Sequence, residues 1–187
     1  MHSKIDDNHV RNTIIQGNIE ALVQVQTLLC KLDDKQYGKI ASDYTESSIG
    51  QHTRHILDIY DAVFLGAAAA DALIDYDVRR RGSRIEFNLA VATASIEQVI
   101  RQLHLLLEVS SWPCLSVSTE VLLSSKESVR VVSNLERELV FAGSHAVHHL
   151  AFMGMIAKIV GIALPDPVGV GPSTASFLRD KSVKDSP

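Results

Sequence analysis

Five of the chain's eight histidines lie in two short runs, and their spacing is the clearest chemical signal in the sequence. His145 and His149 stand one helical turn apart on the same face, with His148 one turn from His145 on the flank. Two imidazoles at this spacing can hold one metal ion. His52 and His55 form a second group in an earlier helical stretch. The sequence therefore predicts a fold that brings the two runs together.

A histidine pair on one helix does not make a stable metal site, so a further ligand must come from elsewhere. The earlier run offers one, and its own residues leave the choice open. The apolar residues of that stretch centre on a direction closer to His52 than to His55, so the helical wheel favours His52. Glu138 lies two turns before His145 and points nearly the same way. It is therefore a candidate to accept a ring N–H from a ligand.

A helical protein without metal is the competing interpretation of the same residues. Inward-facing histidines can hydrogen-bond within a core, or pack at a dimer interface and respond to pH. The sequence contains no His-Glu-x-x-His, no Glu-x-x-His and no Cys-x-x-Cys-His. The ligand motifs of zincins, of di-iron proteins and of proteins with attached haem are therefore missing, whereas a metal site made of imidazoles is compatible with the sequence.

Four stretches with helical periodicity account for most of the chain. We predict helices over about residues 10–32, 49–70, 83–107 and 133–160. Ser47 or Ser48 can cap the second helix. Capping-box patterns at 83–86 and 133–136 are expected to open the third and fourth.

A short segment with a different period separates the last two helices. Between residues 112 and 133, β-branched residues alternate with serine, which predicts a two-stranded hairpin. Residues 35–46 and 71–82 are expected to be connections. Each amphipathic stripe must be buried against another, so we predict a mostly α fold: an up-down four-helix bundle over residues 1–164, with a small β-hairpin inserted before the last long helix. Residues 165–187, rich in Gly, Pro, Ser and charge, are expected to be a C-terminal surface or disordered tail.

Composition argues against several kinds of partner. The chain has 187 residues and a formal net charge of −4, which disfavours nucleic acid. We interpret Arg79-Arg80-Arg81 as a solvated loop rather than a phosphate site, because acidic residues precede it. No long apolar run or apolar leader is present, so we expect a cytoplasmic protein with no membrane partner. Cys30 and Cys114 are isolated, and we interpret them as small buried apolar residues rather than a disulfide or a nucleophile.

The two histidine runs together resemble a known family. The pattern Ile49-Gly50-Gln51-His52-Thr53-Arg54-His55-Ile56-Leu57-Asp58, followed by His145-Ala146-Val147-His148-His149, is similar to the DinB/YfiT-like superfamily of metal-binding four-helix bundles. In that family a second-helix histidine, followed by an apolar residue and by an acidic residue three places on, joins a later HxxxH pair around a divalent metal. The resemblance therefore implies His55, His145 and His149 as metal ligands, in place of His52. His52 and His148 become candidates for a role behind the ligands or facing a substrate.

One segment departs from the family pattern. Many members follow the histidine pair with Arg-Gly-Gln, whereas here His149 is followed by Leu150-Ala151-Phe152. The implied metal ligands are unaffected, but any function that the polar Arg and Gln side chains have in the family cannot be carried over to this chain. A member that keeps its metal and has lost its chemistry is therefore one alternative.

Three histidines leave at least one position for water or substrate, which is typical of a catalytic site. The resemblance implies a metal-dependent hydrolase or thiol transferase that uses zinc, nickel or iron, an unidentified small-molecule substrate such as a thiol, and a homodimer. His52, His148 or Glu138 would then accept a proton or support the ligands. The alternative is a non-catalytic helical bundle that binds a metal or a protein partner.

Overall fold

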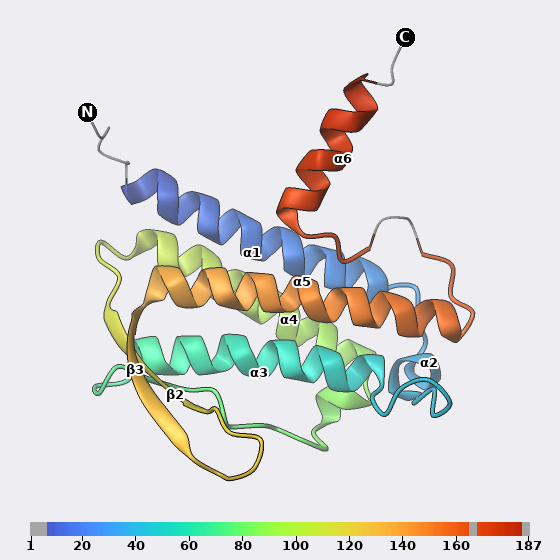
Figure 1. The fold of residues 1–187 in the computed structure, drawn as a ribbon, viewed down its shortest axis with the longest axis horizontal. Helices are drawn as coiled ribbons and strands as arrows, with labels where there is room; N and C mark the ends of the chain where they lie inside the picture. The colour runs from blue at the N-terminus through green and yellow to red at the C-terminus, as the bar shows by residue number, and fades with distance from the viewer. Residues whose placement is uncertain (1–6, 165–167, 185–187) are drawn as a thin grey trace.

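Four long helices supply most of the structure, which is a computed structural model that describes residues 7–164 and 168–184 (Figure 1). They are α1 (Asp7–Leu29), α3 (Ile49–Ala68), α4 (Leu89–Leu105) and α5 (Leu135–Ile159). The shorter helices are α2 (Asp34–Gly38), η1 (Arg84–Glu86), η2 (Leu106–Glu108) and α6 (Pro172–Lys184). Helices α1 and α3 each pack against both α4 and α5, so their apolar stripes meet in one core. The prediction of a mostly α fold is confirmed.

The first histidine run owes its position to the start of α3. Ser48 Oγ accepts from the Gln51 N–H, and Gln51 Oε1 accepts from the Ser48 N–H at 2.9 Å, which completes a capping box. The expected cap at residues 47–48 is thus confirmed at Ser48. Because the helix begins after Ser48, His52 and His55 lie in its first two turns.

The two other predicted capping boxes are wrong, because asparagine caps both helices instead. Asn88 accepts from the Val91 N–H and starts α4, while residues 83–86 form only the single turn η1. Asn134 accepts from the Arg137 N–H and starts α5, one residue later than the pattern at 133–136 implies. Asn and Ser are about equally good N-cap residues, so the sequence pattern alone does not show which of several nearby residues caps the helix.

A small sheet lies against the end of the helices. Strands β2 (Cys114–Glu120) and β3 (Ser128–Asn134) pair antiparallel, which confirms the hairpin. A third strand, β1 (Leu73–Asp75), pairs parallel with β2, giving the order β1-β2-β3. The prediction placed β1 within a connection, because three residues among charged neighbours carry no readable period. Beyond β1, the carboxylate of Asp77 accepts from the Glu120 N–H and the Ser128 hydroxyl, tying the following loop to the hairpin.

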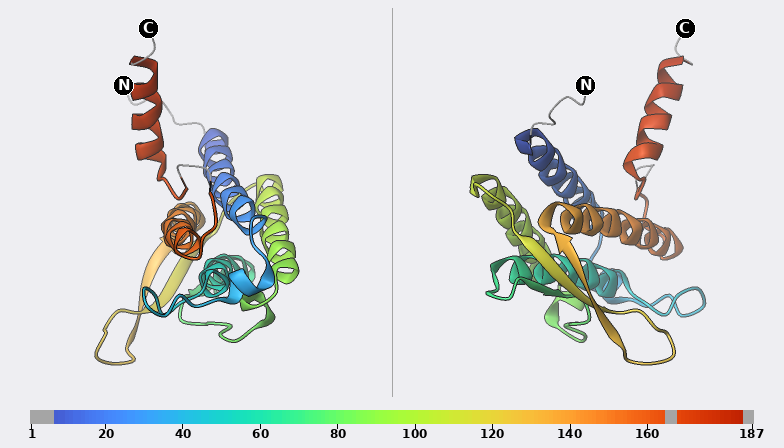
Figure 2. Two further views of the ribbon diagram at one scale, coloured as in Figure 1. Left: turned by 90° about the vertical axis from the view of Figure 1, so that its right-hand side faces the viewer. Right: turned by 60° about the vertical axis from the view of Figure 1, so that its left-hand side comes forward.

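Two helices occupy segments that were expected to lack them. Helix α2 begins one residue before the predicted connection 35–46, overlaps its first residues and has its own capping box between Asp33 and Gln36. Helix α6 forms within the predicted tail and projects from the other helices (Figures 1 and 2). Residues 165–167 and 185–187 of that tail lie outside the described residues. Both cysteines are free and exposed, so their interpretation as buried apolar residues is wrong.

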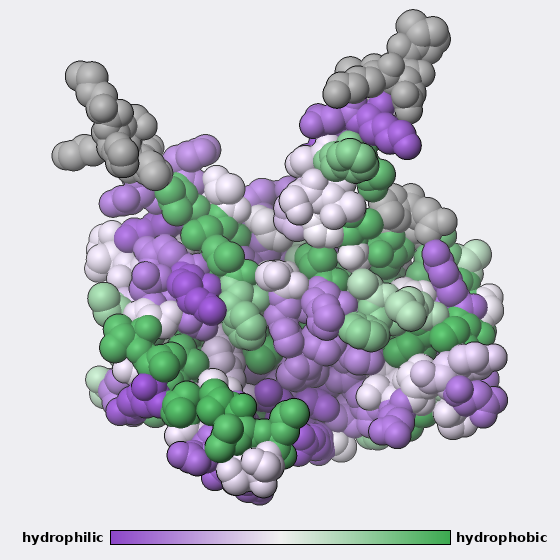
Figure 3. Space-filling model, in the orientation of Figure 1, coloured by the Kyte–Doolittle hydropathy of each residue, from purple (hydrophilic) through white to green (hydrophobic). Residues whose placement is uncertain are grey.

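Helix α5 combines an apolar composition with the second histidine run. By length and composition alone it could cross a membrane, a property that core helices of globular proteins share. Leu139, Ala146 and Leu150 belong to its buried stripe, which packs against α1 and α3. His145 and His149 lie half-buried beside that stripe. On the face in Figure 3, hydrophilic side chains gather over the seam between α3 and α5, and apolar ones gather over the hairpin.

The close approach of α3 to η1 gives a first prediction. A Cβ on Gly50 would lie 2.0 Å from the backbone oxygen of Glu86, whereas a Cβ on Gly17 in α1 would meet nothing within 4 Å. Gly50→Ala should therefore lower the free energy of unfolding by about 2–3 kcal/mol through overpacking. Gly17→Ala should raise it by about 0.5–1 kcal/mol through helix propensity. Urea unfolding followed by circular dichroism measures both, and a neutral Gly50→Ala would contradict this packing.

Candidate metal centre

Three imidazoles from two helices converge where α3 passes α5. His55 of α3 and His145 and His149 of α5 each offer a ring nitrogen, and these atoms all lie within 4.8 Å of one another. All three rings are half-buried. The two helices pack side by side, so residues distant in the sequence become neighbours. The structure thus brings together the three histidines that the family resemblance implies.

The distances within this cluster suit a metal ion. The Nε2 atoms of His55 and His145 face each other at 2.9 Å, and the His149 ring centroid lies 4.7 and 4.5 Å from theirs. Nitrogen ligands of a tetrahedral zinc ion stand about 3.3 Å apart, so small shifts bring these atoms into range. Neutral imidazoles are a donor set that zinc, nickel and iron accept. The residues therefore fit an ion, and three ligands leave at least one coordination position open.

His52 lies behind this cluster rather than within it. Its Nδ1 atom is 2.9 Å from Nδ1 of His149, so one of the two nitrogens carries the shared proton. Because Nδ1 of His149 faces His52, Nε2 of His149 is the nitrogen left for an ion. The Nδ1–H of His149 then donates to His52, a contact that orients a metal-binding imidazole. The helical wheel favours His52, whereas the ring that lies within the three-histidine group is that of His55.

His148 and the apolar segment after it form the outer edge of the cluster. His148 is exposed, and its ring centroid lies 5.5 Å from that of His149. Phe152 packs edge-on against His148 at 5.0 Å and stacks on His52 at 6.0 Å. An aromatic ring thus stands where the family pattern has a polar side chain, and it holds the outer imidazoles by packing.

Glu138 does not contact a histidine among the described residues. Its carboxylate accepts from the Tyr76 hydroxyl at 2.7 Å and from the Ser133 hydroxyl, and it lies 3.4 Å from Arg137. The expectation that it accepts a ring N–H is therefore not met. Glu138 is only 2% exposed, and it links α5 to the loop after β1 and to β3. Burial, more than this hydrogen bond, raises the pKa of Tyr76 above its usual value.

Burial and mutual repulsion keep the clustered imidazoles neutral. Desolvation, followed by the effect of His145, lowers the pKa of His55 to about 4. Desolvation and the neighbouring histidines lower the pKa of His149 to about 3. Burial also lowers the pKa of His145. All three rings are therefore neutral near pH 7, which is the form that binds a metal.

A cavity of about 580 Å³ opens directly onto the cluster. Its lining includes His52, His55 and His149, together with arginine and glutamate side chains. A second cavity of about 350 Å³ shares His55 with the first and reaches His145 on its other side, under the hairpin. Volumes in this range suit small molecules. The cluster therefore stands between a polar and a more apolar space.

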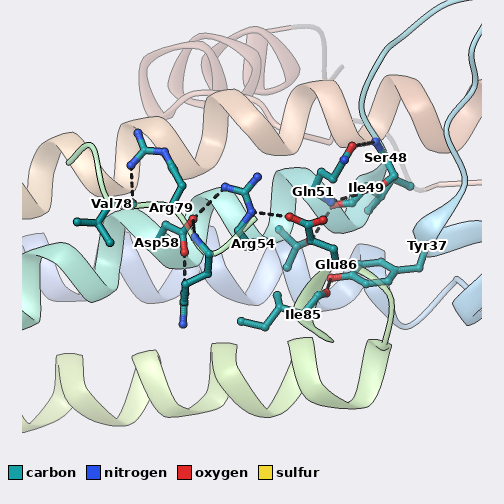
Figure 4. Close-up of polar contacts among 12 residues, drawn as sticks. Tyr37, Ser48, Ile49, Gln51, Arg54, Asp58, Val78, Arg79, Ile85 and Glu86 are labelled. Carbon is teal, nitrogen blue, oxygen red and sulfur yellow. Dashed lines mark hydrogen bonds and ion pairs between the residues drawn. The ribbon is translucent and has the colours of Figure 1, made fainter. Parts of the chain in front are cut away.

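A buried ion-pair network forms one wall of the polar cavity (Figure 4). Arg54 is 8% exposed and donates from Nε to Glu86 and from Nη1 to Asp58, both at 2.9 Å. The other oxygen of Asp58 accepts from Nε of Arg80 at 2.7 Å. Asp58 is the acidic residue that the family pattern places three positions after His55. Here it neutralises arginines and makes no hydrogen bond to a histidine among the described residues.

The arginine run borders the polar cavity, although its sequence predicts a solvated loop. Arg79 and Arg81 line the polar cavity, while Arg80 between them pairs with the acidic residues of α3. Arg79 is half-buried, and its Nη1 donates to the backbone oxygens of Tyr76 and Val78. The interpretation as a solvated loop is therefore wrong for the half-buried Arg79, whereas Arg80 and Arg81 are exposed. Successive side chains of this loop point to different sides, but the residues that they meet lie far away in the sequence.

Comparisons with known proteins do not assign the chain to a family. No family model matches it, and no solved structure matches it. A curated protein with some similarity is FK506-binding protein 5 of Rhizopus delemar, which is 23% identical over 121 residues. That match covers 65% of this chain and 31% of the relative, so the chain spans less than a third of the relative's length.

The ion-pair network gives a second prediction. Asp58→Asn removes the carboxylate that serves two arginines, one of them buried, and should lower the free energy of unfolding by about 3 kcal/mol. Asp61→Asn is the matched control, because among the described residues Asp61 pairs with Arg80 alone and its side chain is 36% exposed. That variant should cost at most about 1 kcal/mol. Denaturant titration at pH 7 compares them, and equal costs would show that Asp58 has no special role.

Proposed function

We propose that this chain is a divalent-metal-dependent enzyme with a DinB/YfiT-like four-helix bundle, in which His55, His145 and His149 hold the ion. The convergence of their three ring nitrogens beside a cavity carries the proposal. A bound zinc, nickel or iron ion would supply Lewis acidity, which lowers the pKa of a water molecule or of a thiol. The reaction class is hydrolysis or group transfer on a small molecule.

The outer histidines take different parts in this proposal. His52 accepts the Nδ1–H of His149, so a neutral His52 carries its own proton on Nε2 and donates to a molecule in the cavity. His148 has no hydrogen-bond partner among the described residues and is exposed to solvent. His148 is therefore the imidazole available as proton acceptor. Glu138 acts on the site only through the packing of Tyr76 and β3.

The cavity sets the size of the substrate in this proposal. About 580 Å³ accommodates a small molecule, and a thiol or a hydrolysable bond would have to approach the side of the cluster formed by His55 and His149. We further propose a cytoplasmic homodimer without a nucleic-acid or membrane partner. The net charge of −4 and the resemblance of the histidine runs support that setting.

Elemental analysis of the purified, untagged protein tests the metal site. We expect about one metal ion per chain in the parent protein, and loss of that ion in His55→Ala and His145→Ala. His52→Ala should keep the stoichiometry but weaken metal affinity by about 10- to 100-fold, because it removes the acceptor behind His149. His104→Ala, which changes an exposed histidine of α4, is the matched control and should bind like the parent.

Two outcomes would overturn this assignment. A parent protein that stays metal-free after incubation with zinc, nickel or iron would favour a non-catalytic helical protein with hydrogen-bonded histidines. Loss of metal in His52→Ala with full binding in His55→Ala would exchange the roles of the two α3 histidines. Circular dichroism of each variant shows that the helices persist, so metal loss is not mistaken for unfolding.

A further inference from the structure

The polar cavity has an excess of positive charge before any ion is bound. Its lining contains the arginines Arg54, Arg79 and Arg81 and the glutamates Glu46 and Glu86. Arg54 and Glu86 are both buried and paired with each other, so their charges cancel. Two arginines then face a single exposed glutamate. A divalent cation on the histidines would increase the positive charge further.

Arg79 and Arg81 have no carboxylate partner among the described residues. Every other arginine next to the cavity is committed: Arg54 to Asp58 and Glu86, and Arg80 to acidic residues of α3. Arg79 uses only Nη1, which donates to backbone oxygens. Figure 4 shows its guanidinium group turned away from Asp58. Its Nε–H and Nη2–H groups, and all the donors of Arg81, are without an acceptor in the described part of the chain.

Arg79 stands close to the proposed metal ligands. It lines both cavities, as does His55, so it lies at the boundary where the two spaces meet the cluster. Among the described residues, Asp58 and Asp77 act on this half-buried guanidinium from beyond ion-pair distance. A bidentate oxyanion is the partner that its planar fork fits best.

The loop conformation directs the two arginines to the same space. Arg80 turns to Asp58 and Asp61, whereas its neighbours on both sides reach the cavity. Asp77 ties the start of this loop to the hairpin, and the Arg80 ion pairs tie its middle to α3. Contacts of the neighbouring residues thus set the positions of Arg79 and Arg81, and Nε and Nη2 of Arg79 take no part in those contacts.

We propose that Arg79 and Arg81 bind an oxyanion, a carboxylate or a phosphate, on the small molecule that occupies the cavity beside His55 and His149. The inference deepens the proposed function, because it names the class of substrate, and it rests on that cavity being the substrate site. The oxyanion site itself uses no metal ligand. The reacting bond of the substrate therefore lies within a few atoms of its anionic group.

The test uses the full chain freed of metal with a chelator and dialysed, so that anion binding is measured without the ion. Thermal unfolding is followed during titration with inorganic pyrophosphate and, separately, with succinate, each against sodium chloride at the same ionic strength. We expect at least one of the two oxyanions to raise the melting temperature more than chloride does. The stronger of the two identifies the group as phosphate or carboxylate.

Variants of the loop locate the binding. The double change Arg79→Gln and Arg81→Gln should weaken the apparent affinity at least about tenfold, as expected when charged bidentate hydrogen bonds are lost. Arg81→Gln alone changes an exposed side chain, keeps the fold and should weaken it about threefold or more. Arg101→Gln on α4 is the matched control and should bind like the parent.

The outcomes separate this inference from the metal assignment. Shifts no larger than those of chloride, or full binding in Arg81→Gln and in the double variant, would overturn the oxyanion site. Metal content is measured on the same preparations after reloading with zinc. A parent that binds zinc but no oxyanion would leave the proposed function standing and remove the inference. If the parent binds an oxyanion but no zinc, and the arginine changes abolish that binding, the inference stands and the proposed metal site is overturned.

Discussion

A guanidinium buried between two elements is unfavourable unless carboxylates pair with it, and the site depends on one such group. Arg54 stands between His52 and His55 on α3, and its partners are Asp58 on the same helix and Glu86 on η1. These bonds hold η1 against the face of α3 that carries Gly50 and Arg54, where Gly50 permits the two backbones to meet. Asp58 also holds Arg80, so the same charges fix the loop that completes the cavity. Breaking the network would loosen the cavity wall before it disturbed the apolar core.

The histidine cluster has the opposite electrostatic character, because its stability requires neutrality. The half-buried rings of His55 and His145 approach at 2.9 Å, so without a cation one nitrogen must carry a proton for the other to accept. The third ring, His149, already gives its Nδ1 to His52. In the metal-bound form proposed above, a cation would replace the hydrogen bond between His55 and His145 and offset the lost hydration of the ring nitrogens. The packing of α3 on α5 therefore brings together half-buried imidazoles that the proposed cation would stabilise.

Sequence periodicity predicts the helices and the face on which each histidine lies. It does not predict features that depend on contacts between residues distant in the sequence. The i, i+4 spacing places His145 and His149 together because helix geometry alone relates them. The alternation in residues 114–134 likewise contains the hairpin. The choice between His52 and His55 depends on how α3 crosses α5, and it came from a family resemblance rather than from the helical wheel. The contacts of the arginine loop cannot be predicted from its own residues, because the carboxylates that pair with Arg80 lie on α3. Strand β1 is likewise defined by its pairing with β2.

The proximity of Arg79 to the cluster links the two proposed ligands. A positive charge that disfavours protonation of His55 and His145 also disfavours a metal cation on the same nitrogens. An oxyanion on Arg79 would neutralise that charge, so each ligand should strengthen the binding of the other, and by the same factor in both directions. The free chain would then hold its ion less firmly than the substrate-bound chain does. The arginine loop would in this way make the electrostatics of the metal centre depend on whether the cavity is filled.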